Sequence, residues 1–126
     1  MLDAIKEALE NAFDIPVYYG TSAPATGKNI YDYIVFWRNR THWNGNKKAD
    51  PSCYYTVALV RQNFIPEDEE TKAFDVLRDI PGLKEASDSD VSFDFLTKPG
   101  TELALEVATY QFVAPRKRLP APEVSE

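Results

Sequence analysis

Two runs of aromatic and β-branched residues constrain the fold of this chain more than any other feature. Residues 30–40 (IYDYIVFWRNR) and 53–64 (CYYTVALVRQNF) are rich in the side chains that strands favour. Residues 33–37 are apolar at both alternating sets of positions. We therefore expect the first strand to be central in a sheet, with both of its faces covered.

Two helical patterns and several shorter extended segments accompany these strands. Residues 2–13 repeat apolar side chains at three- and four-residue steps, which predicts an amphipathic helix. Pro66 opens a second helix that ends before Pro81 and Gly82. Residues 15–19 read as a short extended run, residues 91–95 as a half-exposed strand and residues 103–113 as its hairpin partner. The pattern of residues 83–90 is ambiguous.

This order of elements predicts an α+β fold. We expect a mixed, mostly antiparallel sheet of four to five strands, with both helices packed on one face. The expected folded domain covers residues 1–114. Residues 115–126 are expected to form a flexible tail, because Pro, Glu, Ser and basic residues there offer little to bury.

Charge and cysteine content limit the function classes. The net charge of −6 disfavours a nucleic-acid partner, and the only local basic cluster is Arg116, Lys117 and Arg118. Cys53 is the single cysteine, so no intrachain disulfide is possible. Charged residues at the start argue against a signal peptide, and no apolar run approaches the roughly 20 residues of a membrane helix. We expect the protein to stay in the cytoplasm until something incorporates it, with no membrane partner.

Candidate catalytic and metal-binding residues are few. His42 is the only histidine and lies in a polar loop, so neither His42 nor Cys53 has an evident partner for catalysis. One histidine and one cysteine do not make a transition-metal site, and the acidic residues 88–94 lack the pattern of a calcium loop. We expect no enzymatic activity, no cofactor and no metal.

Two long polar loops, residues 21–29 and 41–52, flank the first aromatic strand. Five basic residues and one tryptophan lie in or beside them: Lys28, Arg38, Arg40, Trp43, Lys47 and Lys48. The acidic residues Glu67, Asp68 and Glu69 suit a helix N-terminus and also supply opposite charge. These residues are the candidate interface, because a positive patch on an acidic body complements another copy of itself. Merely solvated loops remain the alternative.

The sequence resembles the tail terminator family of long-tailed bacteriophages over residues 2–113. The resemblance rests on the order of five segments. An N-terminal helix leads into IPVYYG (15–20), and two strands follow, YIVFW (33–37) and YTVALV (55–60). A helix ending in DIPGL (79–83) and a last strand, LEVATY (105–110), complete the series.

The resemblance implies a structural virion protein at the head-proximal end of the tail. Members of the family cap the tail tube as a hexameric ring, end tube polymerisation and offer a surface to head-completion proteins. The expected partners are thus further copies, the tube protein and a head-completion protein. Arg116, Lys117 and Arg118 would touch passing DNA in the ring lumen only transiently. Another head–tail connector or minor tail component, a small-ligand binding domain and, last, an enzyme remain as alternatives.

Overall fold

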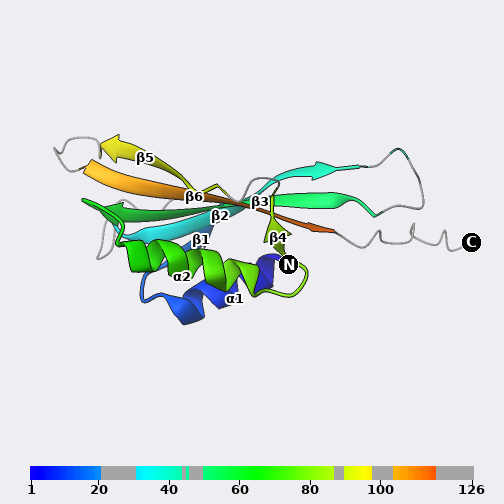
Figure 1. The fold of residues 1–126 in the computed structure, drawn as a ribbon, viewed down its shortest axis with the longest axis horizontal. Helices are drawn as coiled ribbons and strands as arrows, with labels where there is room; N and C mark the ends of the chain where they lie inside the picture. The colour runs from blue at the N-terminus through cyan, green and yellow to red at the C-terminus, as the bar shows by residue number, and fades with distance from the viewer. Residues whose placement is uncertain (21–30, 44, 46–49, 87–89, 98–103, 116–126) are drawn as a thin grey trace, which may run out of the picture.

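The structure of the protein is a computed structural model, which describes residues 1–20, 31–43, 45, 50–86, 90–97 and 104–115. Within these residues the chain forms two helices and six strands. Their order is α1 (Leu2–Ala12), β1 (Val17–Tyr19), β2 (Tyr33–His42), β3 (Ser52–Gln62), α2 (Glu67–Arg78), β4 (Lys84–Glu85), β5 (Ser92–Thr97) and β6 (Ala104–Pro115). Both helices lie against one face of the sheet (Figure 1).

The strands form one sheet in the order β1-β2-β3-β6-β4, and β5 also pairs with β6. β1 and β2 are parallel, while every other described pair is antiparallel. β3 pairs with β6 along its whole length, so β4 and β5 share the other side of β6. The predicted α+β class, the mostly antiparallel sheet and the placement of the helices are confirmed. The sheet has six strands rather than four to five, because two residues of the ambiguous segment form β4.

The larger core lies between the helices and the sheet. Ile5 and Leu9 from α1 and Leu77 from α2 are fully buried there. They pack against alternate side chains of β2, β3 and β6, among them Phe36, Leu59 and Phe112. Burying each such side chain stabilises the fold by about 1.5–3 kcal/mol. The three-and-four spacing that predicts α1 places its apolar stripe on this core.

A second, smaller cluster lies on the opposite face of the sheet. Tyr33, Val35, Ala58, Val60 and Leu105 are buried in it. β2 is therefore covered on both faces at its start and lies between β1 and β3, which confirms the expectation that it is a central strand. Burial raises the pKa of the Tyr33 hydroxyl.

Candidate interaction surfaces

The predicted basic surface is divided by a β-bulge between Arg38 and Arg40. Arg38 pairs with Tyr55 of β3, whereas Arg40 pairs with Tyr54. Adjacent residues of a strand point to opposite faces of a sheet, so the extra residue, Asn39, directs the two arginines to opposite faces. Sequence alternation alone places them on the same face, and a bulge has no reliable sequence signal here. The structure does not bring these two predicted interface residues together.

Each arginine is held by an aromatic neighbour. The Arg38 Nε donates a hydrogen bond to the Tyr19 hydroxyl at 3.2 Å, and this contact raises the pKa of Arg38. Arg38 borders a hollow on the helix face together with Met1 and Cys53. On the other face the Arg40 guanidinium lies 3.7 Å from the centroid of the Tyr54 ring, a cation–π contact.

The other predicted interface residues have different positions. Trp43 follows β2 and is 54% exposed. Lys28, Lys47, Lys48, Arg116, Lys117 and Arg118 lie outside the described residues. β6 continues to Pro115, one residue beyond the expected end of the folded domain.

The three predicted acidic residues at the start of α2 have unequal surroundings. Glu69 is engaged inside the molecule, since its Oε1 lies 2.6 Å from Nη2 of Arg61. Arg61 also approaches Asp32 at 3.5 Å, so one guanidinium joins the start of β2, the end of β3 and α2. Glu67 and Asp68 are exposed and border a surface hollow. Of these three, Glu67 and Asp68 form no ion pair with any other residue that the structure describes.

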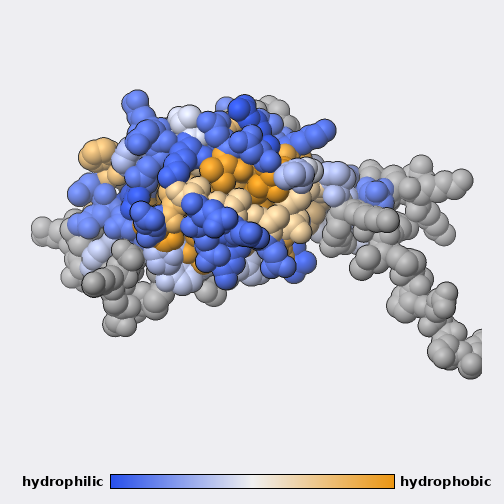
Figure 2. Space-filling view, turned by 90° about the horizontal axis from the view of Figure 1, so that it is seen from below, coloured by the Kyte–Doolittle hydropathy of each residue, from blue (hydrophilic) through white to orange (hydrophobic). Residues whose placement is uncertain are grey.

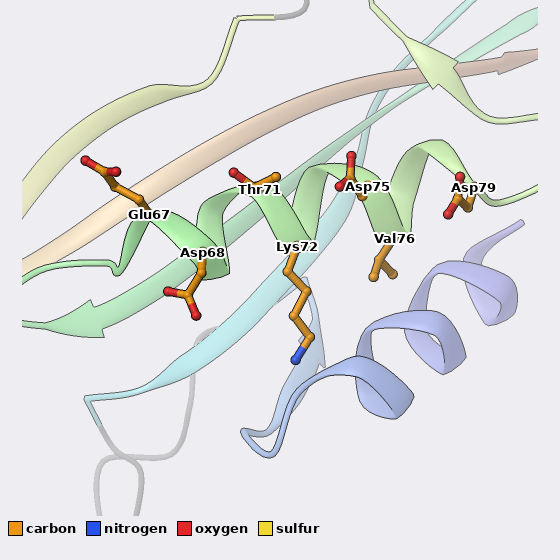
Figure 3. A pocket seen from close by; sticks show the side chains of 7 residues that line it. All are labelled: Glu67, Asp68, Thr71, Lys72, Asp75, Val76 and Asp79. Carbon is orange, nitrogen blue, oxygen red and sulfur yellow. The ribbon is translucent and has the colours of Figure 1, made fainter.

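An interhelical groove runs between α1 and α2 on the surface. A hollow of about 440 Å³ lies between α1 and α2, and a hollow of about 580 Å³ that is lined by the α2 region alone adjoins it at Val76 and Asp79. The two hollows together are called the interhelical groove. Its floor is apolar: Ala4, Ala8, Val76 and Ile80. At its rim, Glu7 and Asp79 border the hollow between the helices, and Glu67, Asp68 and Asp75 border the adjoining hollow on α2. Figure 2 shows the apolar strip on this face with hydrophilic residues around it. In Figure 3 Lys72 and Val76 point from α2 towards α1, whereas Glu67, Thr71 and Asp75 point away from it.

Strand β5 exposes large apolar side chains at one edge of the sheet. Phe93, Phe95 and Leu96 are 42%, 66% and 51% exposed. All six residues of β5 are exposed, so the expected half-buried strand is wrong. Among the described elements β5 packs only against β6, which explains why neither of its faces is covered. The alternating Phe93 and Phe95 predict a strand, but not that its inward face lacks a partner.

The two candidate catalytic residues lie on opposite sides of the sheet. Thr41 pairs with Cys53, and its hydroxyl lies 3.8 Å from the Cys53 sulfur. His42 is the last residue of β2 and does not lie in a loop, so the predicted start of the loop at residue 41 is wrong. Because His42 follows Thr41 along the strand, its side chain points to the other face, where it is exposed. The buried Cys53 thiol thus has no imidazole beside it.

The described residues contain no group of three or more potential metal ligands. Neither of the two described helices is long and apolar enough to cross a membrane.

Neither a protein-family model nor a curated protein sequence matches this chain. The resemblance to tail terminators therefore stays a prediction from the order of the five segments quoted above.

Proposed function

We propose that this protein is a structural subunit that joins copies of itself into a ring and, as such a ring, caps the tail tube of a long-tailed bacteriophage. The ring ends tube polymerisation and offers its other face to a head-completion protein. The observation that carries this proposal is β5, an edge strand with Phe93, Phe95 and Leu96 exposed. A long exposed apolar edge strand pairs readily with another chain unless a partner covers it.

The two edges of the sheet support a head-to-tail arrangement. Among the described strands, β1 pairs only with β2 and forms one edge, while β5 and β4 form the other. Joining the β5 edge of one copy to the β1 edge of the next uses two different surfaces of each subunit. Such a heterologous contact closes into a ring when its rotation is suitable. The α+β fold agrees with the one that the resemblance implies.

The ring proposal is tested with the variant Phe95→Glu. A charge on the exposed edge should abolish self-association, because pairing would bury an unpaired carboxylate. Sedimentation velocity and negative-stain microscopy at high protein concentration should show rings for the natural chain and monomers for the variant. Lys6→Glu, which changes an exposed residue of α1, is the control and should still form rings. Rings that survive Phe95→Glu would remove β5 from the interface.

A further inference from the structure

The interhelical groove combines an apolar floor with four carboxylates that have no cationic partner among the described residues; Asp75, which also borders it, pairs with Arg78. Among the described residues, the salt bridges involve Asp32, Glu69 and Asp75, and none involves Glu7, Glu67, Asp68 or Asp79. The one basic residue on the groove, Lys72, places its ammonium 4.6 Å from the centroid of the Phe13 ring. The groove therefore carries excess negative charge above an apolar strip, a surface that suits a cationic segment with an apolar residue beside it.

The sequence contains one segment with this complementary chemistry. Arg116, Lys117 and Arg118 follow β6 directly, and Leu119 and Pro120 come next. Three cations can pair with the rim carboxylates, while Leu119 can cover the apolar floor. Elsewhere in the sequence no three basic residues are consecutive.

We propose that the interhelical groove of one copy binds residues 116–120 of a second copy. The proposal rests on the self-association proposed above, for which it supplies a second contact. The position of β6 favours a second copy over the same chain. In Figure 1, β6 runs past both helices, and its C-terminal end lies beyond the N-terminal start of α1. Three residues span only about 10 Å, so reaching the groove of its own chain would require an immediate reversal after Pro115.

A labelled peptide of residues 114–122 (APRKRLPAP) tests the groove directly by fluorescence anisotropy. The receptor is the full-length chain with Arg116→Ala, Lys117→Ala and Arg118→Ala, which removes competition from its own segment. We expect saturable binding that weakens about five- to tenfold in Asp68→Asn/Asp79→Asn, because each exposed ion pair contributes about 0.2–1 kcal/mol. Raising the salt concentration should weaken binding further.

The matched control is Glu10→Gln/Asp14→Asn, which removes two exposed carboxylates that do not line the groove. This variant should bind the peptide as tightly as the unchanged receptor. Equal binding by the groove variant, or no binding at all, would refute the proposal. If the chain retains duplex DNA through residues 116–118 and the peptide does not bind the groove, these three basic residues contact a nucleic acid instead.

A mixing experiment distinguishes binding between copies from binding within one chain. One variant keeps the groove and lacks the three cations, and the other keeps the cations and carries Asp68→Asn/Asp79→Asn. Together they should associate more strongly than either does alone, as measured by sedimentation velocity, because one supplies the groove and the other the segment. No gain on mixing would contradict the proposal. If rings form through β5 but the peptide does not bind, the proposal about the groove is wrong. The proposed function is not contradicted by that result.

Discussion

The guanidinium of Arg61 lies 2.6 Å from the carboxylate of Glu69 and thereby ties the end of β3 to the first turns of α2. Both side chains are about one-fifth exposed. Arg61→Met should lower the free energy of unfolding by about 1 kcal/mol, near the upper end for partly exposed pairs. Arg78→Met is the control, because Arg78 forms a longer, 3.4 Å pair with Asp75 that is half exposed. Urea unfolding measures both, and an equal loss in the two variants would contradict this role of Arg61.

The buried hydroxyl of Tyr110 donates a hydrogen bond of 2.9 Å to the main-chain carbonyl of Glu70. Tyr110→Phe removes this bond between β6 and α2 and should cost about 1 kcal/mol of stability. Thermal unfolding at neutral pH measures the loss. An unchanged melting temperature would show that the bond contributes nothing net.

The same tyrosine predicts a pH dependence. Burial, followed by the charges of Glu70 and Glu69, raises the pKa of Tyr110 above its ordinary value of 10.0. The unfolded chain therefore loses the Tyr110 proton before the folded chain does. The stability that this group contributes is complete below pH 10 and falls as the pH rises above it. Stability should decline more steeply above pH 10 in the natural chain than in Tyr110→Phe, and parallel curves would contradict the assignment.

The bulge at Asn39 should tolerate both substitution and deletion. Asn39→Ala keeps the extra residue and should change stability by less than about 0.5 kcal/mol, as is usual at an exposed site. Deleting Asn39 makes Arg38 and Arg40 neighbours in a regular ladder, so Arg40 stays opposite Tyr54 and Thr41 stays opposite Cys53. We expect the deletion to change the free energy of unfolding by less than about 1 kcal/mol, measured by urea unfolding. A loss above about 2 kcal/mol on deletion would contradict this register.

Cys53 should behave as a buried side chain and not as a nucleophile. Its thiol is 1% exposed and faces Thr41 rather than His42. A thiol reagent should modify it only as fast as the protein opens, and the rate should rise sharply in denaturant. Rapid, stoichiometric labelling of the native protein would contradict this placement.

The elements with the strongest periodicity were predictable from the sequence. The stripe of Ile5 and Leu9 marks α1, and the run of residues 33–37 marks a strand covered on both faces. β4 could not be predicted, because two residues carry no period. The bulge at Asn39 could not be predicted either, because one extra residue leaves no periodic pattern. The placement of Arg38 and Arg40 on opposite faces depends on this bulge and was therefore also not predictable.

The interhelical groove depends on which helix faces lie next to each other. Sequence spacing shows which residues share one face of a helix, but not which other helix packs beside that face. Asp68, Asp75 and Asp79 recur at steps of seven and four along the α2 region, which predicts one acidic side. That side becomes the rim of a groove only because α1 packs next to α2. The exposure of β5 likewise depends on the absence of a covering element among the described residues, which no local pattern encodes.

Electron microscopy of phage tails assembled with and without this chain tests the central proposal most directly. With the natural chain, tails should have uniform length and a ring at their head-proximal end. Without it, or with Phe95→Glu in its place, tube polymerisation should run on to uneven lengths and heads should not attach. Tails of uniform length that join heads in the absence of the chain would contradict the account.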